Sequence, residues 1–429
     1  MIRTVKKLMG ILTAIAVIAF GASPLARRIE NLPDEIYLDE AGSIVELATP
    51  LSADITGSRG GTVEVMTLEG ETLSEAGGVP AGEKVILNAA GQSDVDAAMD
   101  VKLFGVTIKT VKISSGAQKK VVPGGHSVGV TLYTNGALIV GMSDMPDGKG
   151  NVVNPALAAG LMAGDIIESV NGVKVDDAPA LTNAINNSSG SVTLGIKRNG
   201  RQMTVDVTPF RDPSDGILRL GAWVRDSMAG VGTLTFYDPS DKGFGCLGHA
   251  ISDIDTRAML DVRDGEIVMA EIVDIKVGQK GSPGEIHGSF RASQSALGSI
   301  NKNSSFGVYG KAYSVISNPV YKKAVPVAPA GQVSLGPASI LSTVDNEGIK
   351  EFDIEIIKIT SQEQAAHKGM VIKVVDEELL RKTGGIIQGM SGSPIMQNGR
   401  LVGAVTHVFV NDPSRGYGIF IQWMLNENK

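Results

Sequence analysis

Apolar and polar residues alternate in short runs along most of this chain, as they do in half-buried β-strands. Between residues 36 and 120 such alternations, for example Val63 and Val65, are separated by glycine-rich breaks. The last run of this region changes phase at Gly105, which predicts a strand with a bulge or a bend. Asn135-Gly136 lies between two apolar runs and predicts a tight hairpin. The pattern therefore indicates a mainly β protein.

Length and composition narrow the class of protein further. The chain has 429 residues, enough for about three folded units at roughly 150 residues each. It carries 39 basic and 46 acidic residues, a net charge of −7, with no lysine-rich or arginine-rich block. This charge pattern argues against a nucleic-acid partner. Cys246 is the single cysteine, so no intramolecular disulfide can form.

The first residues form a candidate membrane segment. An uncharged apolar run extends from Leu8 to Ala26, after Arg3, Lys6 and Lys7, and it is just long enough to span a bilayer. The basic residues in front of it favour a cytoplasmic N-terminus and an exported body. We expect an uncleaved anchor over residues 1–31, because the run is long for a signal peptide. A cleaved signal segment is the alternative.

The region around residues 154–172 has the most distinctive pattern. Pro155 begins a short helix, a glycine ends it, and a strand with an Asn-Gly turn follows. This run, NPALAAGLMAGDIIESVNG, resembles the heart of a PDZ domain. The resemblance extends over about residues 121–209 and makes residues 178–186 the second helix and residues 192–207 the closing strands.

Such a domain adds an extended peptide as a strand to a sheet edge, and N–H groups of a loop bind the terminal carboxylate of the peptide. The resemblance predicts that this loop consists of Gly125, His126, Ser127, Val128 and Gly129. The alternative is a domain that only packs against its neighbours, because a fold alone does not determine a function.

A serine between glycines stands near the C-terminus, in Gly389-Met390-Ser391-Gly392-Ser393-Pro394. A tight turn of this kind lets the N–H groups of Gly389 and Ser391 point at one spot, which is the geometry of an oxyanion hole, with Ser391 as the nucleophile. The segment resembles the nucleophile loop of chymotrypsin-like serine peptidases, and this resemblance implies a double β-barrel. An ordinary Gly/Ser/Pro turn is the alternative.

His249 is the predicted general base. It lies upstream of Ser391, as in the chymotrypsin-like chain order, within a stretch rich in small residues. Cys246 lies three residues before it, which raises the alternative of a thiol nucleophile or a metal site. One cysteine and one histidine are too few for a metal site, and the sequence has no HExxH motif, so we expect no metal and no cofactor.

His407 lies on the apolar strand that follows the nucleophile loop. In chymotrypsin-like folds this strand returns along the primary specificity pocket, so we expect His407 to line that pocket and bind substrate. A histidine in a pocket wall can donate a hydrogen bond to a polar substrate side chain. A half-buried structural histidine is the alternative.

Several features taken together resemble one family over essentially the full length. They are the N-terminal segment, the PDZ-like run, GFGCLGHAISD, and GGIIQGMSGSPI running into GAVTHVFVNDP. This combination is similar to the stage IV sporulation protein B peptidases of endospore-forming bacteria. The resemblance implies a membrane-tethered serine endopeptidase in the space between forespore and mother cell. Such enzymes process themselves and cleave the regulator of an intramembrane protease, which activates a late sigma factor.

The same resemblance places the catalytic acid on Asp376. From the residues alone, an aspartate before Glu-Glu-Leu-Leu is equally a helix N-cap. Asp253 and Asp255 are the other candidates for orienting His249.

The expected organisation is an anchor (1–31), a small β-rich domain (32–120), a PDZ domain (121–212) and a peptidase domain (213–429). The alternative function is a catalytically silent scaffold whose PDZ domain recruits partners at a membrane.

Overall fold

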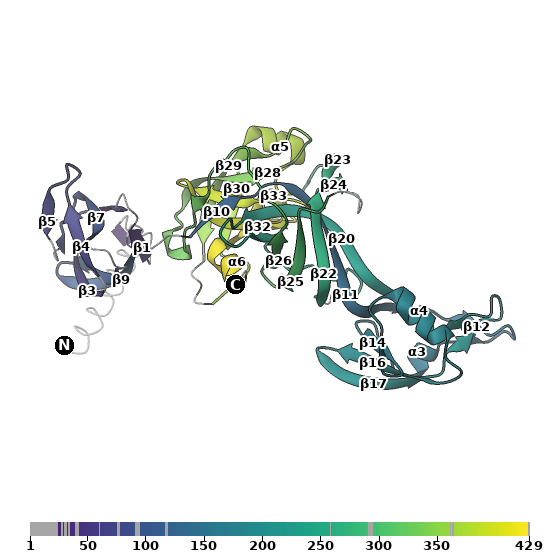
Figure 1. The fold of residues 1–429 in the computed structure, drawn as a ribbon. Helices are drawn as coiled ribbons and strands as arrows, with labels where there is room; N and C mark the ends of the chain where they lie inside the picture. Colours follow the sequence, from purple (N-terminus) through teal and green to yellow (C-terminus); the bar gives the residue numbers. More distant parts are fainter. Residues whose placement is uncertain are drawn as a thin grey trace, which may run out of the picture. The chain divides into compact units, whose positions relative to one another are not determined.

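The computed structural model describes residues 25–26, 29, 32, 35–38, 43–59, 61–74, 78–90, 95–115, 119–257, 259–290, 295–360, 362 and 364–427 (Figure 1). Nearly all of the predicted membrane segment therefore lies outside the described residues. Among the residues that are described, no helix combines the length and the apolar character needed to cross a membrane. The chain divides into two compact units, and the first contains the residues up to Lys120 together with 326–336 and 356–359.

The first unit contains two β-sheets around one core. The larger sheet has the order β1 (Glu35–Leu38), β9 (Val106–Ser115), β8 (Asp96–Leu103), β3 (Leu51–Arg59) and β6 (Gly78–Val79). The smaller has the order β2 (Ser43–Glu46), β7 (Lys84–Ala90), β4 (Thr62–Met66) and β5 (Thr72–Ser74). Alternate residues such as Val63 and Val65 are buried, as the sequence pattern predicted. The 3-10 helix η1 (Ala330–Gln332) also belongs to this unit.

Gly105 has a different role from the predicted one. Phe104 and Gly105, with φ of 51° and 82°, form the turn between the antiparallel strands β8 and β9. The change of phase in the sequence therefore marks a chain reversal and not the predicted bulge or bend. A two-residue turn with positive φ at both positions matches the twist of the strands that it joins.

In the second unit six antiparallel strands form a first closed barrel. Each pairs with the next and the last returns to the first, in the order β11 (Ser127–Met142), β22 (Val262–Met269), β25 (Gly298–Ser304), β26 (Gly307–Ala312), β21 (Gly243–Cys246) and β20 (Ala222–Tyr237). Its interior is filled by apolar side chains, among them Val128, Val130, Phe244, Ile267 and Val308. Strand β10 (Lys120–Pro123) pairs with the end of β20.

A second closed barrel has the order β28 (Gly336–Ser342), β29 (Lys350–Ile359), β30 (Met370–Val374), β33 (Asp412–Phe420), β32 (Arg400–Phe409) and β31 (Pro394–Gln397). The helices α5 (Glu377–Thr383) and α6 (Ile421–Glu427) belong to the same part of the chain. Strands β23 (Glu271–Lys276) and β24 (Glu285–Ser289) form a hairpin, and β27 (Val325–Pro326) is a short strand. The predicted double β-barrel is confirmed.

The PDZ domain is confirmed as well. It contains β12 (Met145–Pro146), β13 (Val152–Val153), α3 (Pro155–Ala158), β14 (Ile166–Val170), β15 (Val173–Lys174), α4 (Ala178–Asn186), β16 (Val192–Arg198), β17 (Arg201–Val207), β18 (Phe210–Arg211) and β19 (Leu218–Arg219). Both helices begin at the polar residues that precede their prolines, because Asn154 accepts a hydrogen bond from the N–H of Leu157 and Asp177 accepts one from Ala180.

Strands β11 and β20 belong to both the first barrel and the PDZ domain (Figure 1). Their pairing shifts register between Tyr133 and Leu138, and Gly136 at this shift has a φ of 99°. Asn135-Gly136 is therefore an irregularity within one long strand and not the predicted hairpin turn. The chain continues because the segments on both sides pair with β20. A Cβ atom on Gly136 would lie 2.2 Å from the carbonyl oxygen of Ile167 on β14, so this close approach requires glycine.

Candidate active site

The loop that carries Ser391 belongs to the second barrel but is held by strand β20 of the first. The N–H of Thr233 donates to the carbonyl of Ser391 (3.0 Å), and its Oγ1 donates to the carbonyl of Gly389 (2.8 Å). Two residues further along β20, Thr235 Oγ1 donates to the carbonyl of Gly392 (2.8 Å). Both threonines are buried. The predicted nucleophile is therefore fixed where the two barrels meet.

Gly389 occupies a position that no other residue fits. Its φ of 96° is unfavourable for a residue with a side chain, and an added Cβ would lie 2.9 Å from Cβ of Ile286. The preceding carbonyl, of Gln388, accepts a hydrogen bond from the N–H of Ile286 (2.8 Å). Because the C=O and N–H of a trans peptide point in opposite directions, this bond directs the N–H of Gly389 away from β24.

The peptide group before Ser391 is oriented in a similar way. The carbonyl of Met390 accepts a hydrogen bond from the N–H of Ser393 (3.0 Å), so the N–H of Ser391 points away from Ser393. Among the described residues, neither this N–H nor that of Gly389 donates a hydrogen bond to a carbonyl. Two oriented, free donors beside the serine are what the predicted oxyanion hole requires.

His249 follows β21 after two residues with left-handed backbone, Leu247 (φ 72°) and Gly248 (φ 71°). Its Nδ1 lies 2.9 Å from the carbonyl oxygen of Ala250. Because that oxygen can only accept, Nδ1 carries the proton and Nε2 keeps the lone pair that a general base uses. Burial lowers the pKa of His249, and His367 lowers it further, so the ring is neutral near pH 7.

One cavity of about 670 Å³ brings the predicted residues together, since His249, Gly389, Ser391 and His407 all line it. The rings of His249 and His407 have their centroids 5.3 Å apart. The other lining residues carry no charged side chain, and most are apolar: Val130, Met228, Ala229, Gly230, Val231, Leu247, Ala250, Ile251, Ser252, Pro283, Ile386, Ile387, Gln388, Thr406, Val408 and Val410.

The hydroxyl of Ser391 donates to the carbonyl oxygen of Thr406 (2.9 Å). Thr406 lies at a shift of register between β32 and β33, where its neighbours Val405 and His407 are paired. Turning the Ser391 hydroxyl toward His249 requires a rotation of that side chain. Catalytic hydrogen bonds often form only when substrate is bound, so this geometry is compatible with a serine nucleophile.

Cys246 is not placed for chemistry. Its side chain is fully buried in the interior of the first barrel. Burial raises the pKa of the Cys246 thiol far above its ordinary value, whereas a thiol nucleophile needs a lowered pKa. The alternative of a cysteine nucleophile is therefore not supported by its surroundings.

Comparison with known families identifies the domains that carry this cavity and the PDZ fold. Residues 216–425 match the family model described as SpoIVB peptidase S55, and residues 149–208 match a PDZ domain model. The chain belongs to the SpoIVB peptidase S55 family. The domains of this S55 peptidase are those of a PDZ-containing serine peptidase.

Two curated proteins are partly similar to the S55 peptidase. A DegP-like periplasmic serine endoprotease of Bartonella henselae is 31% identical over 122 residues, which is 27% of this chain and 24% of the relative. A protein of Lactococcus lactis named as a zinc metalloprotease is 32% identical over 126 residues, 28% of each chain. The chain thus spans about a quarter of the length of these relatives. Their names describe different catalytic groups, so the serine assignment depends mainly on the S55 match.

The structure does not bring Asp376 to His249. Asp376 is the N-cap of α5, where one carboxylate oxygen accepts from the N–H of Leu379 (2.8 Å) and the other from the N–H of Asp353 (3.4 Å). The geometry therefore favours the alternative of a helix cap over the catalytic acid that the resemblance implied. The helix ends at Gly384, whose φ of 75° is typical of a C-terminal cap.

The two reserve candidates are engaged elsewhere as well. Arg225 binds both, with 2.6 Å to the carboxylate of Asp253 and 3.2 Å to that of Asp255. Asp253 is buried and also accepts hydrogen bonds from the N–H groups of Asp255 and Thr256. Within the described residues, the ring nitrogen of His249 that is hydrogen-bonded has a backbone carbonyl as its partner, and no carboxylate orients the ring.

We expect the S55 peptidase with Asp376→Asn to keep its turnover within a few-fold of wild type. Asparagine caps a helix as well as aspartate does, whereas loss of a catalytic aspartate lowers kcat by about 10⁴-fold. The measurement is kcat on a short peptide together with the thermal midpoint. Asp376→Ala, which removes the cap, should cost about 1 kcal/mol of stability. A loss of several orders of magnitude in Asp376→Asn would restore Asp376 as the catalytic acid.

The predicted carboxylate-binding loop lies outside the PDZ domain. Gly125 and His126 precede β11, and Ser127 to Gly129 form its first residues, which pair with β20 and β22 of the first barrel. Nε2 of His126 lies 3.1 Å from the carbonyl oxygen of Ser317. The core of the PDZ domain begins only at Ala137. The loop prediction was therefore wrong, because β11 enters the PDZ domain from the barrel.

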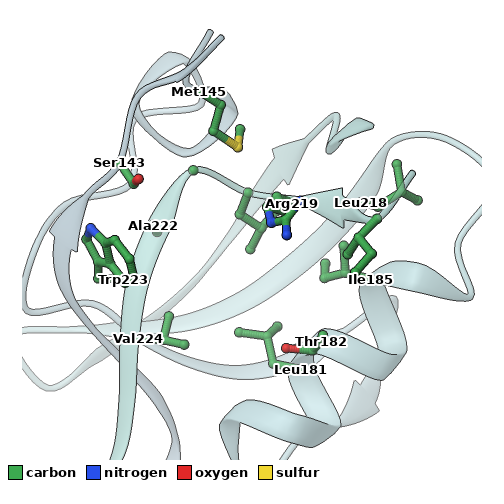
Figure 2. Close-up of a pocket in the computed structure, with 13 residues that line it drawn as sticks. Ser143, Met145, Leu181, Thr182, Ile185, Leu218, Arg219, Ala222, Trp223 and Val224 are labelled. Carbon is green, nitrogen blue, oxygen red and sulfur yellow. The ribbon is translucent and has the colours of Figure 1, made fainter. Parts of the chain in front are cut away.

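The PDZ domain contains a pocket of about 360 Å³ between a helix and a free strand edge, where a peptide can bind (Figure 2). It is lined by α4, including Leu181, Thr182 and Ile185, and by residues 217–224. Residues 222–224 of β20 pair with β11 on one edge, and no described strand pairs with their other edge. A free strand edge beside a helix is the place where a PDZ domain adds a peptide.

The sequence contained a signal for this pocket. Leu220-Gly221-Ala222 places a glycine between apolar residues directly before a strand, and Gly221 has a φ of 78°. An added Cβ there would lie 2.9 Å from Oδ1 of Asn154. The signal was missed because residues after 212 were assigned to the peptidase domain.

Proposed function

We propose that this protein is a membrane-tethered endopeptidase of spore formation, which processes itself and then cleaves the regulator of an intramembrane protease. The proposed location is the space between forespore and mother cell, and the proposed result is activation of a late sigma factor. The family match and the apolar N-terminal run support this proposal. The observation that carries the peptidase chemistry is the meeting of Ser391, two free N–H donors and a neutral His249 in one cavity.

The proposed reaction begins when Ser391 Oγ attacks the carbonyl carbon of the scissile bond. His249 Nε2 takes the hydroxyl proton, and the N–H groups of Gly389 and Ser391 bind the oxygen that becomes negative. His249 then gives the proton to the leaving amine, and the C–N bond breaks. A water molecule, deprotonated by the same Nε2, hydrolyses the acyl-enzyme and returns Ser391 to its starting state.

The cavity also indicates which substrate segments fit. Its lining has no carboxylate, ammonium or guanidinium group that could pair with a charged side chain. Burying an unpaired charge is costly, so we expect the residues next to the scissile bond to be uncharged and mostly apolar. His407, as a wall of this cavity, is the proposed hydrogen-bonding partner for a polar substrate side chain.

The mature N-terminus tests self-processing. We expect the full chain, produced in cells with its membrane segment, to yield a shortened form whose new N-terminus is found by mass spectrometry. Labelling of the same sample with a fluorophosphonate should modify Ser391. A chain that keeps its original N-terminus and resists the label would instead support the silent scaffold.

The PDZ pocket is the proposed recruitment site for protein substrates. Thr182 is exposed on α4 and lines the pocket, so Thr182→Glu places a negative charge where a peptide terminus would bind. We expect this variant to slow cleavage of the protein substrate about tenfold and to leave kcat on a short peptide unchanged, because the pocket supplies only remote binding energy. Relative rates on the two substrates are the measurement.

Thr204→Glu on β17 is the matched control, since Thr204 is exposed and lies outside the pocket. It should affect neither rate. Equal slowing of both substrates by Thr182→Glu would indicate a structural role for the domain. Deletion of residues 121–209 is not a usable test, because it removes the part of β11 that closes the first barrel.

A further inference from the structure

His249 and His407 come from different barrels and meet in the catalytic cavity, where their ring centroids are 5.3 Å apart and their planes are inclined by 40°. A zinc ion bound to two imidazole nitrogens lies about 2.1 Å from each nitrogen and so about 3.2 Å from each ring centroid. At a tetrahedral angle the two centroids are then about 5 Å apart. The spacing of the two rings thus matches that of two imidazoles that share a metal ion.

We propose that His249 and His407 form a site for a divalent cation of the zinc class, and that the bound cation reversibly inhibits the peptidase. The inhibitory effect rests on the proposed role of His249 as general base. A metal ion on Nε2 of His249 occupies the lone pair that must accept the proton of Ser391. Metal binding and catalysis are therefore mutually exclusive.

The surroundings of His249 are those of a metal ligand. Its Nδ1–H donates to the carbonyl of Ala250, and metal-binding histidines usually fix their second nitrogen in this way. This contact leaves Nε2 free and directs it. The structure records no hydrogen bond for the ring of His407 with any described residue, so no such bond has to break when the ring turns toward a metal ion.

Two features keep the proposed binding reversible. Zinc sites in proteins usually have at least three protein ligands, and the described residues contain no group of three or more metal-binding side chains. Water would complete the coordination here. Lys368, whose Nζ lies 4.6 Å from the centre of the Tyr417 ring, adds a positive charge near His407 and weakens cation binding. We therefore expect an inhibitory site rather than a site with a resident metal ion.

Inhibition of short-peptide hydrolysis by Zn²⁺ tests the proposal. We expect His407→Phe, which keeps a ring but removes both nitrogens, to raise the Zn²⁺ concentration for half-inhibition about tenfold or more. Expressing each curve relative to the rate of the same variant without metal removes any change in basal rate. Mg²⁺ should not inhibit, because imidazole favours the zinc class of ions. His287→Ala is the control, since His287 is exposed and lies outside the cavity.

A titration without activity separates this proposal from the proposed function. The full chain with Ser391→Ala should bind one equivalent of Zn²⁺ by calorimetry, and adding His407→Phe or His407→Gln should remove that binding. Unchanged binding or half-inhibition in both His407 variants would overturn the metal site. If peptide hydrolysis is absent but the titration behaves as expected, the metal site stands and the peptidase proposal fails.

Discussion

Ser391→Ala should abolish self-processing and cleavage of other substrates, with kcat/KM lowered by about 10⁴-fold or more. The substitution removes the nucleophilic oxygen and little volume, and the one hydrogen bond it removes, to the carbonyl of Thr406, is made by that same oxygen. Fluorophosphonate labelling should disappear together with turnover. The thermal midpoint should remain close to that of wild type, which shows that the loss is chemical.

The Ser-Gly-Ser motif provides a matched control two residues away. Ser393 is fully buried, and its Oγ lies 3.1 Å from Oγ of Ser342, away from the catalytic cavity. Ser393→Ala should lower stability by about 1 kcal/mol, because it leaves a buried hydroxyl without its partner, and it should retain labelling and turnover. Labelling that survives in Ser391→Ala but is lost in Ser393→Ala would show that Ser393 is the nucleophile and that the assignment of Ser391 is wrong.

Local turn chemistry could be predicted from the sequence only where no distant strand competed with it. Asn398-Gly399 forms a turn between β31 and β32, with φ of 51° and 72°, as this residue pair favours. Asn135-Gly136 has the same two residues but lies within the long strand β11, because both flanking segments find partners on β20. The dipeptide specifies a preference for positive φ, and the strands available for pairing decide whether the chain reverses.

The reactive residues of the candidate site could be predicted from the sequence, but the residues that orient them could not. Ser391, Gly389 and His249 stand out in the sequence because glycines surround them, and close approach of two backbones requires glycine. The residues that orient these three have no such pattern around them. Thr233 is an ordinary strand residue until β20 is placed beside the nucleophile loop. Asp376 shows the opposite case, because a helix cap and a catalytic acid look alike in the sequence and differ only in their contacts.

The predicted boundary at residue 212 falls between the two family matches, 149–208 and 216–425, but the core of the PDZ domain also includes side chains between residues 218 and 224. A linear division of the chain cannot represent β11 and β20, each of which contributes one half to the barrel and the other to the PDZ domain. The first residues of β20, including Ala222 and Val224, line the peptide pocket, whereas Met228 to Val231 line the catalytic cavity. The two sites therefore share one strand, so the peptide pocket takes residues from both sides of the predicted boundary at residue 212.

Gly389→Ala should lower kcat by about 10²- to 10³-fold with Ser391 and His249 still in place, which is the usual cost of losing one oxyanion donor. The left-handed φ of 96° disfavours alanine, and the new methyl group would meet Cβ of Ile286 at 2.9 Å. Since the hydrogen bond between Ile286 and Gln388 directs the N–H of Gly389, relief of this clash must turn that N–H away from the oxyanion.

Gly399→Ala separates the loss of the oxyanion donor from general backbone strain. Gly399 also has a left-handed φ, of 72°, but an added Cβ would have no atom within 4 Å, and the residue lies in the hairpin between β31 and β32. Both substitutions should cost about 1 kcal/mol of stability through the backbone, and only Gly389→Ala should also lower kcat. Single-turnover acylation by a peptide ester measures the chemical step directly. If Gly389→Ala acylates as fast as Gly399→Ala, the oxyanion is bound elsewhere and the assignment of this loop is wrong.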